Sequence, residues 1–77
     1  MSIATEVVAR RRLPAPAMAR EIRLAAGVSQ GRMAKELGVT SITVSRWEAG
    51  SRVPRGELLV RYVALLDELS SLTRSAS

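Results

Sequence analysis

The chain contains no cysteine and no histidine, and its only aromatic residues are Trp47 and Tyr62. Without cysteine it cannot form a disulfide bond or a thiolate metal site. Without histidine it also lacks the commonest general base and metal ligand. Because the sequence has no phosphate-binding loop and no cluster of acidic groups either, we expect no enzyme activity, no metal site and no cofactor.

No apolar run in the sequence reaches about 18 residues, the length that a membrane-spanning helix requires. At the start, MSIATEVVARRRL, the charges follow the apolar residues, which is the reverse of a secretory signal. We therefore expect no membrane segment, and a location in the cytoplasm, associated with the nucleoid.

Lysine is also scarce: Lys35 is the only one, and the remaining basic residues are arginines. The 77 residues carry a net charge of +5 and a pI of about 11.4, and this length allows one small domain with a modest core. A basic helical chain most often binds nucleic acid, although the charge could also serve solubility alone. Arginine is the better residue for paired contacts to phosphate and guanine.

The segment QGRMAKELGVTSITVSRWEA, residues 30–49, predicts two short helices, 30–37 and 41–49, joined by a tight turn. Gly38 falls at the turn, where a positive φ favours glycine, and Thr40 can cap the second helix. Ala34 lets the two helices approach closely. The inward-facing positions are Met33, Leu37, Val39, Val44 and Trp47. This pattern is typical of a helix-turn-helix, which can present its second helix to a DNA major groove.

The flanking segments complete the predicted organisation. A basic N-terminal arm over 1–15 holds a short helix that Ser2 can cap, followed by the proline-rich hinge LPAP. The next helix is expected from about Pro16 to Ala26, and a long final helix from Gly56 or Glu57 to about Leu72. The sequence therefore predicts an all-α fold of four or five helices, with one domain over 16–73 and a disordered tail over 74–77.

The final helix carries two apolar stripes. The first consists of Leu59, Val63 and Leu66. The second has the 3.5-residue period of a coiled-coil seam. Because a small domain can cover one stripe, we expect a second copy or another protein to cover the second. This candidate dimer stripe consists of Leu58, Tyr62, Leu65, Leu69 and Leu72.

The stretch IRLAAGVSQGRMAKELGVTSITVSRWEAGSRVP resembles the phage repressor/Cro type of helix-turn-helix, also called the xenobiotic-response-element family. The resemblance covers about residues 16–66 and implies a lambda-repressor-like fold. It also implies a sequence-specific regulator of transcription that binds double-stranded DNA, as a compact phage- or plasmid-type repressor does. The chain departs from the family in its long leader and at Asp67 and Glu68, where the family turns into a further helix.

The resemblance implies roles for individual residues. The helix over 41–49 would read base edges through its exposed positions, which are Ser41, Ile42, Thr43, Ser45 and Arg46. The expected phosphate contacts are Gln30, Arg32, Thr40, Arg52 and Arg55. Arg23 and Glu48 match the family's internal ion pair between the first and third helices, which has a structural role.

Several alternatives stay open at the level of sequence. Arg10, Arg11 and Arg12 could enter a minor groove, add only non-specific affinity, or contact a protein. Besides a homodimeric repressor on a pseudo-palindromic site, the chain could be an antitoxin whose C-terminal helix binds a different protein. It could also be a phage excision or recombination factor that bends DNA. A small-molecule substrate is not expected.

Overall fold

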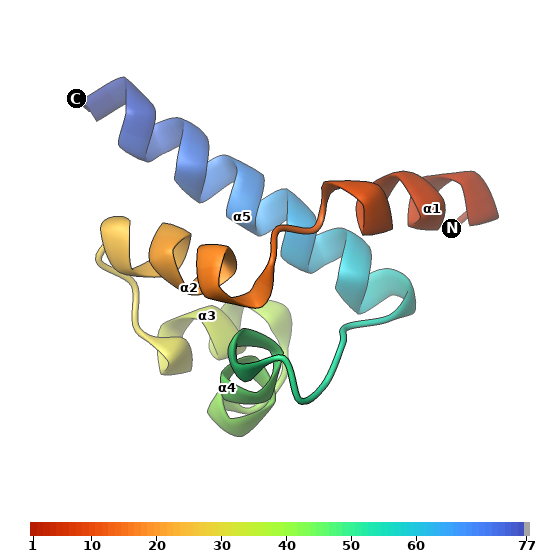
Figure 1. Ribbon diagram of the computed structural model, residues 1–77, viewed down its shortest axis with the longest axis horizontal. Helices are drawn as coiled ribbons and strands as arrows, with labels where there is room; N and C mark the ends of the chain where they lie inside the picture. Colours follow the sequence, from red (N-terminus) through yellow and green to blue (C-terminus); the bar gives the residue numbers. More distant parts are fainter. Residues whose placement is uncertain (77) are drawn as a thin grey trace.

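The computed structural model describes residues 1–76, which fold into five α-helices and no strand. The helices are α1 (Ile3–Arg12), α2 (Pro16–Ala25), α3 (Gln30–Leu37), α4 (Ser41–Ala49) and α5 (Gly56–Ala76). The all-α fold predicted from the sequence is thereby confirmed. In Figure 1, α5 crosses the whole molecule, with α1 beside its first half and α2, α3 and α4 packed below it.

The main core lies between α5 and the helix-turn-helix formed by α3 and α4. The rings of Trp47 and Tyr62 meet there with their centroids 4.7 Å apart and their planes tilted by 47°. Val39 packs against this core from the turn, so the inward-facing positions predicted for residues 30–49 do face inward. The buried members of the core are Ala19, Met33, Ala34, Leu37, Val44, Trp47, Tyr62 and Leu66.

The segment predicted as a separate arm is a docked helix. Ser2 caps α1, its hydroxyl accepting from the backbone N–H of Thr5 at 3.1 Å. Ala9 is buried against Leu59 and Val63 of α5 in a second small core, and α1 therefore belongs to the folded unit. The prediction of a separate arm is wrong because the first stripe of α5 offers apolar surface that α1 covers.

The candidate dimer stripe of α5 is largely covered within the chain. Tyr62 is only 1% exposed, and Leu58, Leu65 and Leu69 pack against the main core. These three leucines are half-buried, and Leu72, at 61% exposure, is the most exposed member. Within the chain, α1 covers Leu59 and Val63 of the first stripe, and the core built by α2, α3 and α4 packs against the second. That a second copy or another protein covers the part of the second stripe left exposed stays a prediction.

The end of α5 also differs from the prediction. The helix continues to Ala76, so residues 74–76, expected in a disordered tail, are helical. No glycine or proline follows Gly56, and the Thr73 hydroxyl donates to the carbonyl of Leu69 at 2.9 Å, a bond compatible with a helix. The basic side chain of Arg74 suits the negative end of the helix dipole. Ser77 lies outside the described residues.

Candidate nucleic-acid interface

The turn between α3 and α4 sets the angle at which α4 is presented. Gly38 ends α3 with a φ of +73°, and the N–H of Val39 donates to the carbonyl of Ala34 at 3.0 Å. This closes α3 with a left-handed glycine, as such turns require. Ala34 itself is 2% exposed, which leaves no room for a larger side chain where the two helices pack.

Thr40 fixes the first turn of α4. Its hydroxyl oxygen accepts from the backbone N–H of Thr43 at 3.2 Å, which satisfies one of the free N–H groups at the helix start. The hydroxyls of Thr40 and Thr43 also lie 3.1 Å apart and bond to each other. Thr43 is half-buried, so it contributes to the order of this turn as well as to its surface.

The outer face of α4 is open to solvent. Val44, Trp47 and Glu48 are buried on its inner side, whereas Ile42 on the outer side is 61% exposed. A large apolar side chain amid small polar ones gives this face a mixed chemistry that can meet both thymine methyl groups and polar base edges. The exposed members of the predicted base-reading set are Ser41, Ile42, Ser45 and Arg46.

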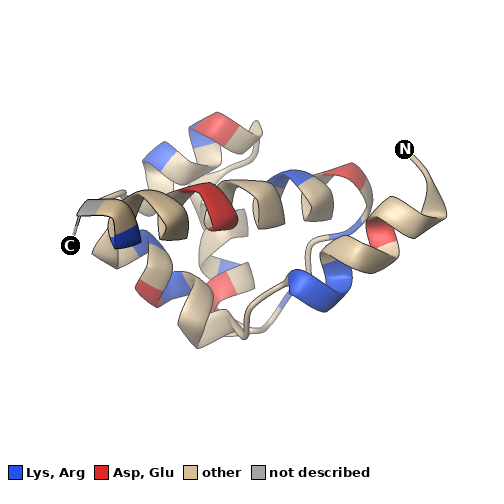
Figure 2. Cartoon of the chain, turned by 90° about the horizontal axis from the view of Figure 1, so that it is seen from above, with Lys and Arg blue, Asp and Glu red and all other residues tan. Residues whose placement is uncertain are grey.

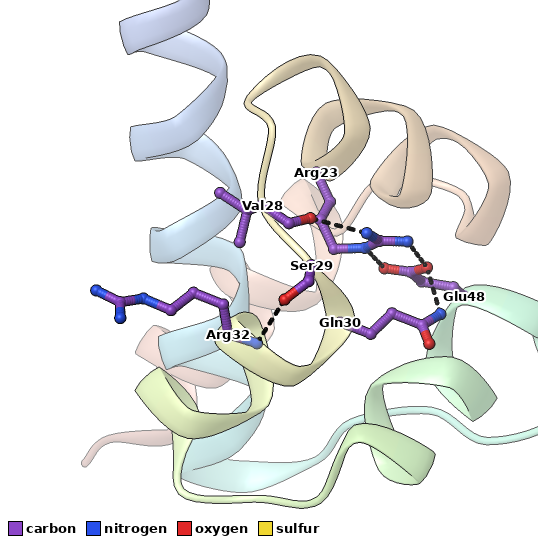
Figure 3. Close-up of polar contacts among 6 residues, drawn as sticks. All are labelled: Arg23, Val28, Ser29, Gln30, Arg32 and Glu48. Atoms are coloured by element: carbon purple, nitrogen blue, oxygen red, sulfur yellow. Dashed lines mark hydrogen bonds and ion pairs between the residues drawn. The ribbon is translucent and has the colours of Figure 1, made fainter.

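A buried ion pair holds α4 to α2 (Figure 3). Arg23 donates from Nε to Glu48 Oε2 at 2.6 Å and from Nη2 to Glu48 Oε1 at 2.9 Å. Its Nη1 donates to the carbonyl of Val28 at 2.8 Å. The family resemblance implied this pair between the first and third helices of the family, which are α2 and α4 here. The two parallel hydrogen bonds fix the orientation of both side chains.

The surroundings of the pair favour its charged form. Burial alone would raise the pKa of Glu48, but the hydrogen bonds from Arg23 and Gln30 and the charge of Arg23 hold that pKa below its ordinary value. The hydrogen bond to Glu48 outweighs burial at Arg23 and raises the pKa of the guanidinium. Both groups are therefore ionised in the folded protein near neutral pH.

Gln30 and Arg32, both predicted to contact phosphate, point in opposite directions (Figure 3). Gln30 Nε2 donates to Glu48 Oε1 at 3.1 Å, so its amide is held at the start of α3 beside α4. A primary amide has a second N–H to offer a phosphate. Arg32 instead lines a groove between α3 and α5, with Met33 and Leu65. The structure thus brings Gln30 to the α4 side and places Arg32 away from it.

A hollow of about 680 Å³ lies beside α4, between that helix and the loop of residues 50–55. Arg46 lines it from α4, and Arg52 and Arg55 line it from the loop. All three arginines are exposed, and the Gly50 N–H and Ser51 N–H bond back to carbonyls of α4 at 3.3 and 3.0 Å, which ties the loop to the helix. The arrangement places three cations around one surface next to the exposed face of α4.

Arg10, Arg11 and Arg12 lie on α1, away from α4 (Figures 1 and 2). Arg12 forms an ion pair with Asp67 of α5, and Arg10 Nη2 lies 3.5 Å from Glu6 Oε1. A side chain that enters a minor groove from an arm does so from an extended, mobile chain, whereas these residues end a docked helix. The structure therefore does not bring them to the α4 face.

One contact near this surface could not be found from the sequence. The Glu6 carboxylate of α1 accepts from the backbone N–H of Gly56, directly after Arg55. The two residues are 50 positions apart, and neither belongs to a motif that links them. Only the docking of α1 on α5 creates the contact.

Comparison with known proteins gives one finding. A helix-turn-helix family model matches residues 20–71, from within α2 to within α5. No curated protein and no solved structure matches the chain. Among the helices of residues 1–76, none is both long enough and apolar enough to cross a membrane.

Proposed function

This chain belongs to the helix-turn-helix family of Cro/C1-type DNA-binding transcriptional regulators, and from that membership we propose that it is a sequence-specific repressor. The exposed face of α4 carries the proposal, since Ile42 is 61% exposed on a helix whose opposite side is buried. Ser41, Ile42, Ser45 and Arg46 would meet base edges in the major groove. Arg46 could donate to O6 and N7 of a guanine, worth about 1–3 kcal/mol of discrimination.

The phosphate contacts would flank this helix on two sides. Gln30 lies at the N-terminus of α3, where a phosphate also meets free backbone N–H groups. Arg52 and Arg55 lie across the hollow beside α4. The Thr40 hydroxyl already accepts from the Thr43 N–H, and when the Thr43 hydroxyl donates to it as well, its own proton is free for a phosphate oxygen. Arg32 is left out of this set because it lines the α3–α5 groove.

Repression would follow from occupancy: a protein bound across a promoter excludes the polymerase. A single α4 reads only a few base pairs, and each mismatch costs about 1–3 kcal/mol. Against the many competing sites of a genome, two half-sites give the specificity that one cannot. We therefore include a homodimer on a two-fold-symmetric site in the proposal, with the half-sites about one helical turn apart.

The experiment is selection of bound duplexes from a random pool with the full chain, followed by sequencing. A two-fold-symmetric motif supports specific binding by a dimer, and a single half-site supports specific binding by one copy. No enrichment over the starting pool refutes sequence-specific recognition. Arg46→Ala serves as the matched variant, and it should lose the preference at one base pair of each half-site rather than affinity for all sequences.

Repression itself is tested with a reporter placed behind the selected motif. Expression should fall when the wild-type chain is produced and should recover with Arg46→Ala. Activation of the reporter by the wild-type chain would contradict repression while leaving DNA recognition intact.

A further inference from the structure

The helix α1 lies outside the residues that match the family model, and it brings a carboxylate to the start of α5. Glu6 Oε1 accepts from the backbone N–H of Gly56 at 3.1 Å. Glu6 is half-buried, which weakens competition from water for this bond. The N–H of Gly56 is one of the free donors at the start of α5, and Glu6 satisfies it from another helix.

The bond acts on the peptide unit that joins Arg55 to Gly56. The carbonyl of Arg55, at the other end of this unit, accepts from the N–H of Leu59 at 3.3 Å. The peptide plane is thus held at both its polar ends. Gly56 adds a φ of +60°, a left-handed conformation that turns the chain from the loop into α5. These two hydrogen bonds therefore fix the orientation of the backbone at Arg55, where the loop ends.

Two further contacts hold Glu6 in place. Ala9 is buried against Leu59 and Val63, and Arg12 forms an ion pair with Asp67, so α1 is attached at its middle and at its end. Arg10, one helical turn after Glu6, lies 3.5 Å from the same Oε1 oxygen. The carboxylate therefore sits on a docked helix and cannot follow the loop if the loop moves.

We propose that Glu6 is a positioning residue for DNA binding, which holds the loop of residues 50–55 so that Arg52 and Arg55 face the backbone beside α4. This inference rests on the phosphate roles given to those two arginines in the proposed function. It assigns α1 a role that differs from direct contact with DNA: Glu6 holds the first residue of α5, where the loop ends, and the arginines of the loop would contact the phosphates.

The direction in which one substitution changes the DNA affinity distinguishes a positioning role from general electrostatics. Removing any acidic side chain from a basic DNA-binding protein makes the long-range attraction to DNA stronger. Glu6→Ala should nevertheless weaken binding about three- to tenfold, the range expected for one lost hydrogen bond. Glu6→Gln removes the same charge but keeps an oxygen acceptor, and it should bind as the wild type does or better. Glu57→Ala, at an exposed acid next to Gly56, is the control for charge alone and should not weaken binding.

The assay is fluorescence anisotropy with a mixed-sequence duplex at low salt, because phosphate contacts do not depend on base sequence. Urea denaturation of each variant checks that the protein is folded at the assay temperature. A loss of affinity in Glu6→Ala with none in Glu6→Gln supports the inference. Equal affinity of Glu6→Ala and Glu57→Ala would overturn it.

A double-mutant cycle with Arg55→Ala completes the test. If Glu6 acts through Arg55, the double variant should lose much less than the product of the two single fold-losses. Fully independent losses refute the positioning role while leaving the phosphate contact of Arg55 in place. If Arg55→Ala alone leaves both the affinity and its salt dependence unchanged, the phosphate role of Arg55 fails as well, and the inference fails with it.

Discussion

Glu48→Ala should destabilise the protein by about 3 kcal/mol, because it leaves the charge of Arg23 buried without its carboxylate. Arg23 is 6% exposed, and after the substitution the carbonyl of Val28 is the one hydrogen-bond partner left to its guanidinium within the described part of the chain. Gln30 loses its acceptor as well. The cost is therefore the desolvation of a cation, rather than the loss of one surface contact.

The size of this effect is large for a chain of 77 residues. At about 0.05–0.15 kcal/mol per residue, the total free energy of unfolding is about 4–12 kcal/mol. A loss of about 3 kcal/mol lowers the melting temperature by about 12–24 °C in a domain of this size. Replacing both members, as in Arg23→Met with Glu48→Leu, should restore much of the stability because no buried charge is left unpaired.

Trp47 provides the assay. It is the only tryptophan and lies in the core, 4.7 Å from the ring of Tyr62, so its fluorescence should change on unfolding. Urea and thermal denaturation of Glu48→Ala would be compared with Glu68→Ala, a substitution at an exposed acid that should change stability by no more than about 0.5 kcal/mol. A loss below about 1 kcal/mol in Glu48→Ala would refute the reasoning about the buried pair.

Three further predictions concern the same core and turn. The folded-state pKa of Glu48 lies below its ordinary value of 4.5. The stability that the ionised carboxylate contributes is therefore present above pH 4.5 and is lost as the pH falls through the lowered pKa. In a plot of the free energy of unfolding against pH, Glu48→Gln should remove this loss on the acid side. Tyr62→Phe should leave the free energy of unfolding unchanged or raise it by about 1 kcal/mol, because the buried hydroxyl has no hydrogen-bond partner among residues 1–76. A clear loss in urea denaturation would contradict this. Gly38→Ala should cost about 1–2 kcal/mol through its φ of +73° alone, since no atom lies within 4 Å of the added methyl group. Gly31→Ala, inside α3 with its methyl group 3.9 Å from the Ser29 hydroxyl, should instead stabilise by about 0.5–1 kcal/mol, and equal effects at the two glycines would count against the argument from φ.

The mixed character of the α4 surface suggests how affinity and specificity divide. Arg46, Arg52 and Arg55 surround the hollow beside α4. Under the proposed function Arg52 and Arg55 would contact DNA phosphates, and arginine–phosphate contacts make the DNA affinity depend steeply on salt. Ile42 carries no charge, so its contribution should persist at high salt. Comparing the salt slopes of Ile42→Ala and Arg55→Ala would therefore separate the two terms.

Local patterns determined much of this protein without reference to its packing. The bounds of α3 and α4, the left-handed turn at Gly38 and the cap at Thr40 follow from glycine conformation and from hydroxyl groups next to free N–H groups, all within a few residues. The buried sides of α3 and α4 follow equally from apolar spacing. The family resemblance, which the match over residues 20–71 bears out, depends on the same local residues.

The tertiary structure decided which surfaces meet. The two stripes of α5 were visible in the sequence, but what covers them was not, because Ala9 gives α1 too weak an apolar signal to predict its docking against Leu59 and Val63. That docking covers Leu59 and Val63 of the first stripe, and it places Glu6 against Gly56, 50 residues away in the sequence. The opposite directions of Gln30 and Arg32 were likewise set by what each meets in space: Gln30 donates to buried Glu48, while Arg32 lies along α5. Sequence spacing specifies a helix and its faces, whereas contacts between distant segments depend on how whole helices pack.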